Sequence, residues 1–322
     1  MKKFLILFPI FTYGVIGFAQ PNAHGSGKFT IVIHGGAGTI SQSLPDTVKQ
    51  DYLRSLDSAL AIGKNMLAQG DSALDVVEKV INFFENDPKF NAGKGAVYTS
   101  DEQHEMDASI MDGRDLSCGA VAGVKHIVHP ISLARLVMEK TVHVLLAGEG
   151  AEKFAHSVGI PLVPSSYFDT PNRLQQLRTM QKKLREGNHG TVGCVVLDSY
   201  GNLAAGTSTG GMTNKMPGRI GDSPLIGDGT YANNKTCAVS CTGWGEKFIK
   251  HTVAYNVSAL IEYKGMTLKQ AVDEIIYKQL NNDDGGLIAV DKYGNYAMEF
   301  NTSGMFRGVA NSAGLFETAI WK

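Results

Sequence analysis

The chain has 322 residues, of which 43% are hydrophobic and 19% are charged, a composition typical of a globular protein with a large buried core. Its 30 Lys and Arg residues nearly balance its 31 Asp and Glu residues, so the formal net charge is −1. No excess of one sign extends over the molecule. The composition therefore speaks against a protein that binds nucleic acid or an anionic membrane surface.

The first twenty residues differ from the rest of the chain. Lys2 and Lys3 precede an apolar run that ends in small residues at Ala19. This pattern predicts a signal peptide over residues 1–19, and Pro9 speaks against a membrane anchor. We therefore expect an exported protein, periplasmic or secreted, with no membrane association after the signal is removed.

Export would permit disulfides between the four cysteines, Cys118, Cys194, Cys237 and Cys241. Cys237 and Cys241 lie four residues apart on one predicted strand, at a separation of roughly 13 Å. They are too far apart to bond to each other. All four lie in apolar segments, so we expect buried free thiols.

Strand and helix patterns follow the leader in chain order. Residues 29–34 predict a buried strand that ends in the glycine turn H-G-G-A-G. Helical patterns cover residues 46–68, 71–86, 130–147, 246–263 and 267–280, and strand patterns cover 104–112, 117–124, 191–198, 203–209, 237–242 and the segment from 286. Residues 161–190 form a polar, basic linker that is partly helical. Runs of strands on both sides of helix pairs predict layers of α and β structure with antiparallel pairing.

Two glycine-rich motifs suggest alternative chemistries. The stretch H-G-G-A-G at residues 34–38 lacks a complete dinucleotide fingerprint and a Walker lysine, which speaks against nucleotide binding. The stretch G-T-S-T-G at residues 206–210 matches the nucleophile elbow of serine hydrolases, with Ser208 as the nucleophile. The residues after it contain three glycines and a proline where that motif requires a helix. A serine hydrolase is therefore a weaker alternative.

The dipeptide Gly190-Thr191 stands before a predicted buried strand. A threonine hydroxyl needs a base, and His189 is badly placed for this role because side chains alternate along an extended chain. Cleavage of the Gly190–Thr191 bond would give Thr191 an α-amine with a pKa of roughly 8, close to its own hydroxyl. One residue would then supply nucleophile and base. From these residues alone, a simple strand start remains an open alternative.

Several longer stretches occur with this dipeptide: G-T-V-G-C-V-V-L-D, T-S-T-G-G-M-T-N-K-M-P-G-R-I-G-D-S-P, T-G-W-G, N-A-G-K-G-A-V and M-D-A-S-I-M-D-G. Together with H-G-G-A-G they resemble the plant-type asparaginase and isoaspartyl peptidase family of N-terminal-nucleophile hydrolases, over nearly the whole mature chain. The resemblance implies an α+β fold, a four-layer αββα sandwich. It also implies a precursor that cuts itself into residues 20–190 and 191–322, an (αβ)2 assembly, and hydrolysis of asparagine or of β-aspartyl peptides.

The same resemblance implies a role for each site residue. Thr191 is the expected nucleophile, Thr209 its hydrogen-bond partner and Asn91 a helper on the facing chain. Arg219 and Asp222 are expected to hold the α-carboxylate and α-amine of the substrate, a dipeptide or small molecule. The substrate pocket is expected to comprise Arg219, Ile220, Gly221, Asp222, Thr242, Gly243, Trp244 and Gly245, with Thr242 and Gly243 also at the oxyanion.

Catalysis requires no cofactor in this family, but a loop resembles its structural sodium site. Backbone carbonyls are expected from Phe84, Glu85, Asp87, Phe90, Ala92 and Lys94. Trp244 departs from the family pattern, in which a smaller or polar residue is frequent, so the accepted leaving group stays open. Glycosylasparaginase shares the R-x-G-D region, although H-G-G-A-G and N-A-G-K-G fit the asparaginase branch better. A non-catalytic binding protein built on glycine loops is the remaining alternative.

Overall fold

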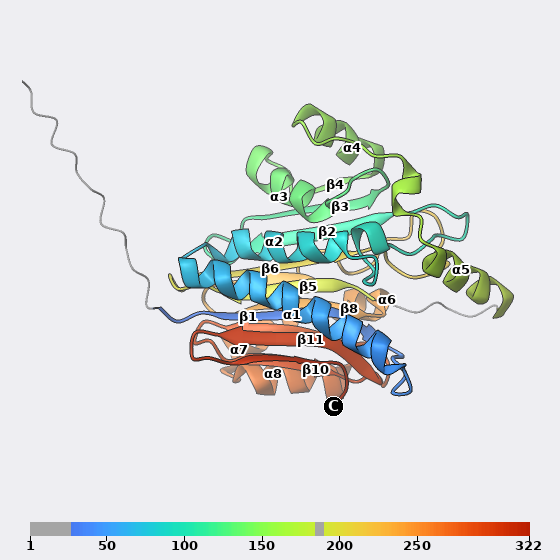
Figure 1. Cartoon of the computed structure of the whole chain (residues 1–322). Coiled ribbons are helices and arrows are strands. Elements are labelled where there is room, and N and C mark those ends of the chain that lie inside the picture. The colour runs from blue at the N-terminus through green and yellow to red at the C-terminus, as the bar shows by residue number, and fades with distance from the viewer. Residues whose placement is uncertain (1–26, 184–189) are drawn as a thin grey trace, which may run out of the picture.

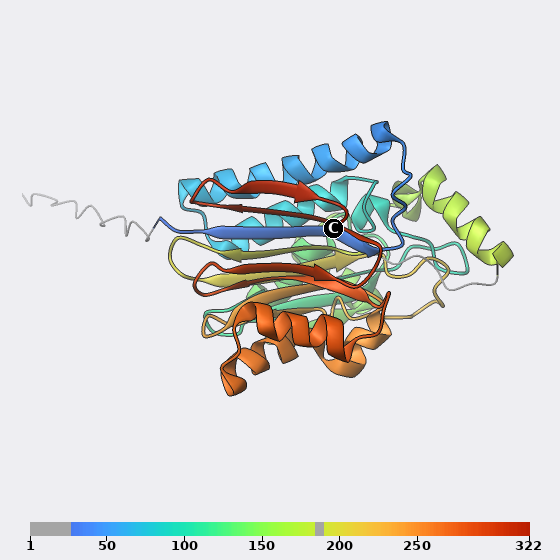
Figure 2. The same cartoon turned by 90° about the horizontal axis from the view of Figure 1, so that it is seen from below.

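A computed structural model describes residues 27–183 and 190–322 of the chain. Strands form an eight-stranded sheet in the order β12-β11-β1-β5-β6-β2-β3-β4 and a four-stranded sheet in the order β10-β9-β8-β7. The two sheets stack face to face, with α1 to α3 outside the larger one and α7 and α8 outside the smaller one (Figures 1 and 2). This confirms the predicted α+β sandwich with layers in the order αββα. The proposed signal peptide and His189 lie outside the described residues.

The elements up to the linker are β1 (Thr30–Gly38), α1 (Asp46–Gln69), α2 (Ala73–Asn86), η1 (Gly93–Gly95), β2 (Met106–Asp112), β3 (Cys118–Val124), α3 (Pro130–Lys140), β4 (Leu145–Ala147), α4 (Gly148–Ser157), η2 (Ser165–Phe168) and α5 (Pro171–Lys183). The later elements are β5 (Val192–Leu197), β6 (Leu203–Thr209), β7 (Thr230–Ala232), β8 (Cys237–Gly243), α6 (Gly245–His251), α7 (Val253–Lys264), α8 (Leu268–Glu274), η3 (Ile275–Gln279), β9 (Gly285–Asp291), β10 (Tyr296–Phe300), β11 (Gly304–Asn311) and β12 (Phe316–Ala319).

Alternation along β5 determines which side chains face each layer. Val192, Cys194 and Val196 pack in the core beneath the helices α1 and α2, whereas Val195 and Leu197 pack between the two sheets. Both faces of β5 are buried, which explains its nearly continuous apolar sequence. Because side chains alternate, the odd-numbered positions, counted back to residue 191, face the space between the sheets.

The structure corrects several predicted boundaries. The strand predicted for residues 29–34 continues to Gly38 through a bulge between His34 and Gly36, so H-G-G-A-G is not a turn. The helix predicted for residues 130–147 ends at Lys140, because the β-branched residues that follow favour extended structure. Three residues then form the edge strand β4 beside β3.

One more helix differs from its pattern. The helix predicted for residues 246–263 is split into α6 and α7 at Thr252, whose φ of 46° is left-handed. The linker predicted for residues 161–190 is partly helical as expected, because it contains the helix α5. The side chains of Arg173 and Leu177 in this helix are buried, so α5 packs against the body of the molecule.

All four cysteines are free thiols, as expected, and all but Cys118 are buried. Within the described part of the chain, no helix has the length and apolar character needed to cross a membrane.

Candidate active site

Thr191 lies immediately before β5, at the edge of the space between the sheets. Pairing of Val192 with Ser208 across β5 and β6 places Thr191 beside Thr209. The Thr191 hydroxyl donates to Thr209 Oγ1 at 3.2 Å, and the Thr209 hydroxyl donates to the Gly190 carbonyl oxygen at 3.0 Å. Both threonines are buried. The predicted pair is therefore in contact, and it contacts the predicted scissile peptide.

Asn91 supplies a second donor to the same carbonyl. Its Nδ2 donates to the oxygen of Gly190 at 2.7 Å and to that of Gly211 at 2.6 Å. Its Oδ1 accepts from the Val97 N–H at 3.0 Å, which fixes the orientation of the amide. Two donors thus converge on the Gly190 oxygen, as in sites that stabilise a tetrahedral oxyanion.

The glycines of β1 lie against this peptide. Gly36 has a φ of 113°, and a Cβ added there would lie 3.2 Å from Gly190 Cα and 3.3 Å from Thr191 N. A side chain at residue 36 would be strained and would press on the predicted scissile bond. The H-G-G-A-G motif therefore gives close backbone approach to Gly190-Thr191.

The Arg219 guanidinium occupies a slot lined by glycines. A Cβ at Gly221 would lie 2.7 Å from it and one at Gly245 2.9 Å, so both predicted glycines provide space. The guanidinium forms two parallel bonds to Glu246, Nε to Oε1 and Nη2 to Oε2, each 2.9 Å long. Its ion-pair partner is therefore Glu246, a residue that the sequence motifs did not identify, and Asp222 makes no such bidentate contact.

Asp222 is a buried carboxylate with an unsatisfied oxygen. Within the described residues, its Oδ2 has no hydrogen-bond partner. Burial raises its pKa to about 7, and the nearby Arg219 opposes this shift. An unpaired carboxylate oxygen in a buried position suits an ammonium group.

The remaining predicted pocket residues lie around β8. The buried Thr242 hydroxyl accepts from the Ala37 N–H at 3.1 Å, so its own proton is available to a ligand. Gly243 has a φ of 151°, and a Cβ there would lie 2.2 Å from the Asp284 oxygen.

Trp244 is half-buried, and Lys247 lies over its ring. Ile220 is exposed.

Two cavities meet at Gly190. A depression of about 10 Å³, large enough for roughly one water, is lined by Gly190, Thr191, Thr209, Gly211, Arg219, Gly221, Asp222, Ser223 and Gly243. The structure therefore brings the predicted nucleophile and clamp into one small space that Gly190 partly fills.

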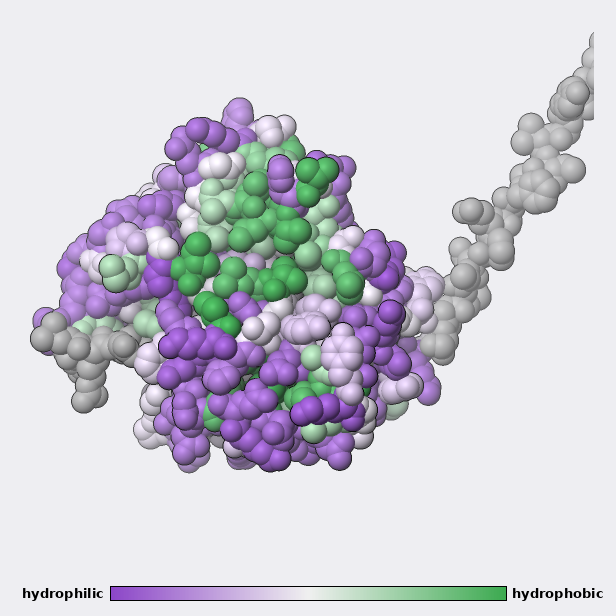
Figure 3. Space-filling view, turned by 180° about the vertical axis from the view of Figure 1, so that it is seen from behind, coloured by the Kyte–Doolittle hydropathy of each residue, from purple (hydrophilic) through white to green (hydrophobic). Residues whose placement is uncertain are grey.

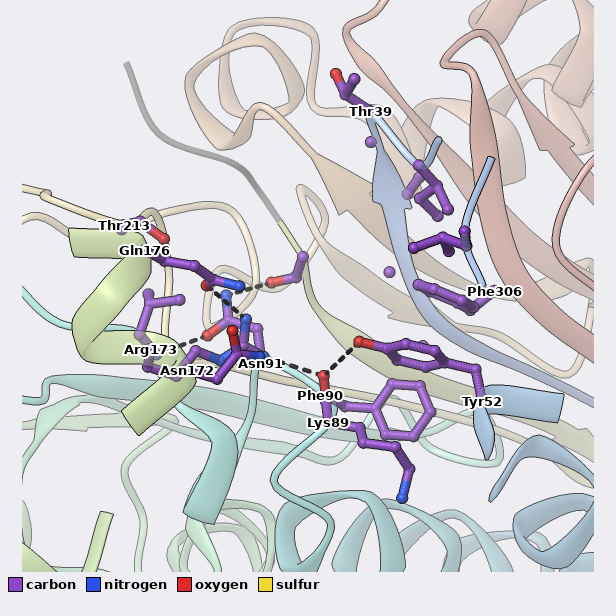
Figure 4. Close-up of a pocket in the computed structure, with 18 of the residues that line it drawn as sticks. Thr39, Tyr52, Lys89, Phe90, Asn91, Asn172, Arg173, Gln176, Thr213 and Phe306 are labelled. Carbon is purple, nitrogen blue, oxygen red and sulfur yellow. Dashed lines mark hydrogen bonds between the residues drawn. The ribbon is translucent and has the colours of Figure 1, made fainter. Parts of the chain in front are cut away.

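A cavity of about 430 Å³ lies on the other side of Gly190 (Figure 4). Its walls are β1, Tyr52 of α1, Asn91, and Arg173 of α5, and neither Arg219 nor Asp222 reaches it.

The predicted sodium loop is tightly wound. A Cβ at Gly93 would lie 2.3 Å from the Glu85 carbonyl oxygen, and one at Gly95 would lie 1.9 Å from that of Phe90. The loop therefore crowds backbone oxygens, the ligands that hard cations prefer. The carbonyls of Phe84, Asp87, Phe90 and Ala92 each accept one backbone bond and keep a second lone pair. In the described residues, no cluster of three His, Cys, Asp or Glu side chains could bind a metal.

Ser208 faces the opposite side of the large sheet from Thr191. It is fully buried under the helices, and its hydroxyl donates to Glu85 Oε1 at 2.7 Å. Burial raises the pKa of Glu85, which His129 and the Ile131 N–H also contact. Ser208 therefore holds α2 to β6 and has no access to a substrate, which speaks against a serine hydrolase.

One buried polar residue near Thr191 was not predicted as a site residue. His34 of β1 lies 2.9 Å through Nδ1 from the Thr191 carbonyl oxygen. In the sequence His34 stands out only as part of H-G-G-A-G, and no spacing signal distinguishes it from a core histidine.

The layered fold, with a threonine at the start of a central strand, defines the class of N-terminal-nucleophile hydrolases. The chain belongs to the asparaginase family, whose profile matches residues 27–320. It is 47% identical to the isoaspartyl peptidase of Salmonella typhimurium, over 92% of this chain and 99% of that protein. It is 44% identical to the probable isoaspartyl peptidase/L-asparaginase 2 of Arabidopsis thaliana (92% and 100%) and to the isoaspartyl peptidase/L-asparaginase of Bos taurus (85% and 91%). The protein is a hydrolase of this type.

These relatives correct the prediction of export. Isoaspartyl peptidases of bacteria, animals and plants are generally cytosolic, and a signal peptide is not shown for this chain. The apolar pattern of residues 1–19 was therefore insufficient to predict a periplasmic or secreted protein.

Proposed function

We propose that the chain cuts itself before Thr191 and then hydrolyses β-aspartyl dipeptides and L-asparagine. The observation that carries this proposal is the pair of donors, Asn91 and Thr209, on the carbonyl of Gly190. If Gly190-Thr191 only began a strand, its carbonyl would not need two side-chain donors. Here two donors and a threonine hydroxyl converge on one peptide bond.

Self-cleavage follows from this arrangement. The Thr191 oxygen attacks the Gly190 carbonyl carbon while its proton moves toward Thr209, along the existing 3.2 Å hydrogen bond. Asn91 and Thr209 stabilise the resulting oxyanion. Collapse breaks the C–N bond, the Thr191 nitrogen takes a proton, and an ester joins Gly190 to the Thr191 oxygen. Water hydrolyses this ester and leaves a free amine on Thr191.

The mature site would use the same oxygen. The neutral Thr191 amine accepts the hydroxyl proton as the oxygen attacks the side-chain carbonyl of the substrate. Ammonia or an amino acid departs with a proton, and water then hydrolyses the aspartyl ester to release L-aspartate. Thr242 has a hydroxyl proton free to bind the oxyanion, and Gly243 lines the same depression.

Substrate selection would depend on Arg219 and Asp222. The free α-carboxylate and α-amine distinguish asparagine and β-aspartyl peptides from internal asparagine in a protein. The carboxylate takes guanidinium N–H groups beside or in place of Glu246, and the ammonium takes the unpaired Asp222 oxygen. The site is almost filled while Gly190 is attached, so we expect binding only after cleavage.

The test compares wild type with Thr191→Ala and Ser208→Ala, with β-aspartyl-leucine and asparagine as substrates. Chromatography of released aspartate should show activity for wild type and Ser208→Ala and none for Thr191→Ala. Removal of the Ser208 hydroxyl deprives the buried Glu85 of one donor, which should cost at least about 1–3 kcal/mol of stability. Loss of activity in Ser208→Ala with an intact fold would instead support a serine nucleophile.

Glycosylated asparagine is the second candidate substrate for this chemistry. The comparisons favour the isoaspartyl peptidase/L-asparaginase branch. Trp244 adds a large half-buried ring beside Gly245, which leaves less room for a sugar. Release of aspartate from glycosylasparagine faster than from β-aspartyl-leucine would reverse this assignment.

We also propose that the loop of residues 84–94 binds a structural Na⁺ through its carbonyls. The ion would stabilise the loop that carries Asn91 and would take no part in the chemistry.

We further propose an (αβ)2 assembly. Apolar side chains gather in Figure 3 at the end of the molecule where β3 and β4 lie. Val142, Val144 and Leu145, on or just before the edge strand β4, are exposed. Open apolar edges of this kind are usually covered by a partner. Light scattering that gives the mass of a single αβ unit would contradict this proposal.

A further inference from the structure

His34 and four hydroxyl side chains form a buried hydrogen-bond chain between the two sheets. His34 Nε2 lies 3.0 Å from Ser240 Oγ on β8, and Ser240 Oγ lies 2.7 Å from Thr207 Oγ1 on β6. Thr207 contacts Thr230 Oγ1 on β7 at 2.5 Å, and Thr230 contacts Ser109 of β2 at 2.8 Å. All five side chains are buried without exposure.

The contact between His34 and the Thr191 carbonyl determines which group donates in each hydrogen bond of this series. The Thr191 carbonyl can only accept, so Nδ1 carries the proton and Nε2 accepts from the Ser240 hydroxyl. Since each hydroxyl has one proton, Thr207 donates to Ser240 and Thr230 donates to Thr207. Burial lowers the pKa of His34 to about 3, against the effect of its bond to the Thr191 carbonyl, so the ring is neutral. Every proton as far as Thr230 points toward Thr191.

The sequence keeps space open for this contact. A Cβ at Gly193 would lie 2.1 Å from Ser240 Oγ and 2.2 Å from His34 Nε2. Gly193 is two residues from Thr191 and faces the same side of β5. The second glycine of G-T-V-G therefore allows the histidine and serine to meet beneath the nucleophile, which is an observation independent of the hydrogen bonds.

We propose that His34 is a positioning residue for Thr191. It donates a hydrogen bond to the backbone carbonyl of Thr191. This bond orients the Thr191 hydroxyl in the precursor and the Thr191 amine after cleavage. This inference rests on the proposed function. After cleavage no peptide bond restrains Thr191 on its N-terminal side, so the anchor on its carbonyl becomes more important. His34 acts as a neutral donor and does not serve as the base.

Two conservative variants separate the two ends of the imidazole. In His34→Asn the amide nitrogen takes the place of Nδ1 and keeps the bond to Thr191. In His34→Gln the amide reaches the place of Nε2, near Ser240, and leaves the Thr191 carbonyl without its donor. A small displacement of a reacting group can reduce the rate by about 100-fold.

The experiment measures the half-time of self-cleavage by intact mass, and kcat and KM with β-aspartyl-leucine. His34→Asn should stay within about threefold of wild type, and His34→Gln should lose about 10- to 100-fold in both rates with little change in KM. Ser240→Ala, which keeps the ring but removes its support, should fall between them. Ser258→Ala is the matched control, because its buried hydroxyl pairs with Thr236 at 2.6 Å and takes no part in the hydrogen bonds that lead to His34.

Equal losses in His34→Asn and His34→Gln would overturn the proposal, because they would indicate that only the ring volume matters. Wild-type rates in His34→Gln would overturn it as well. If neither His34 variant folds, Ser240→Ala decides, and behaviour identical to that of Ser258→Ala contradicts the proposal. Failure of the wild-type chain to cleave or to release aspartate would instead reject the proposed function.

Discussion

Asp222 combines a proposed binding role with a cost to stability. Its pKa in the free protein is raised to about 7 by burial, and a bound ammonium would lower it again. We therefore predict that kcat/KM for β-aspartyl-leucine falls below about pH 7 as Asp222 takes up a proton. In the substrate complex the bound ammonium keeps Asp222 ionised, so its ionisation should appear in kcat/KM and be missing from kcat. The Thr191 amine should titrate in both profiles. Identical acid limbs in kcat and kcat/KM would contradict this assignment.

The raised pKa of Asp222 also determines how the stability of the fold depends on pH. An acid whose pKa is raised on folding stabilises the fold while it is protonated, fully below its unfolded pKa, and this contribution is lost as the pH rises toward about 7. Asp222→Asn should therefore raise the melting temperature at pH 8 more than at pH 5, while weakening substrate binding. Thermal unfolding at both pH values tests this. An equal change at both would show that Asp222 is not a buried charge.

Individual site residues differed in how well the sequence revealed them. Thr191, Thr209 and Asn91 lie in motifs that resemble those of the family, so the resemblance identified them, and the structure brings them together. Glu246 escaped prediction because its bond to Arg219 joins a loop to a helix start 27 residues later in the chain. His34 escaped because its partners are Thr191, just before β5, and Ser240 of β8, and one sequence contains no signal for such pairing.

At the scale of elements, α5 links the segment before the proposed cleavage point to the loop that carries Asn91. Arg173 is buried, and it donates to the carbonyls of Gly95 at 2.7 Å and Lys89 at 3.2 Å. Figure 4 shows it beside Asn91 at the larger cavity. The segment predicted as a linker thus contains a helix with a buried anchor.

We predict that Arg173→Gln slows self-cleavage by about tenfold, because the loop and its Asn91 donor lose two fixed contacts. Arg178→Gln is the matched control on the same helix, since Arg178 is about half exposed and pairs with Glu102. Time courses of intact mass measure both variants. An Arg173→Gln rate equal to that of Arg178→Gln would show that α5 does not position Asn91.

The loop of residues 84–94 provides a second prediction at this scale. If Na⁺ binds its carbonyls, replacing NaCl by choline chloride at constant ionic strength should lower the melting temperature. The linked stabilisation grows by about 1.4 kcal/mol for each tenfold excess of ion over its dissociation constant. A melting temperature equal in the two salts would argue against a sodium site.

Element boundaries were predicted well where periodicity was strong. The helix α1 and the pair β5 and β6 match their patterns within a residue or so. Errors occurred where tertiary contacts override local signals: β1 continues through two glycines because it pairs with β11, and β4 forms because β3 offers an open edge.

At the scale of the whole molecule, the four layers explain why the site lies where it does. Large and small sheets meet through β1, β5, β6, β8 and β9, and Thr191, the proposed nucleophile, lies immediately before β5, a strand buried on both faces. Residues from both sides of the proposed cleavage point build the site: Asn91 and His34 before it, Thr209, Arg219 and Asp222 after it. The proposed function therefore requires the two chains to remain associated after cleavage, and the packed core between the sheets would hold them together.

The central claim is that Gly190 and Thr191 are separated by the chain itself, and a denaturing intact-mass spectrum of purified wild-type protein tests it most directly. After standing at neutral pH, the protein should give two masses that sum to the starting chain plus one water, with the second beginning at Thr191. Thr191→Ala should give a single mass under the same conditions. A single wild-type mass together with measurable aspartate release, or cleavage at Gly190 in Thr191→Ala, would contradict the account.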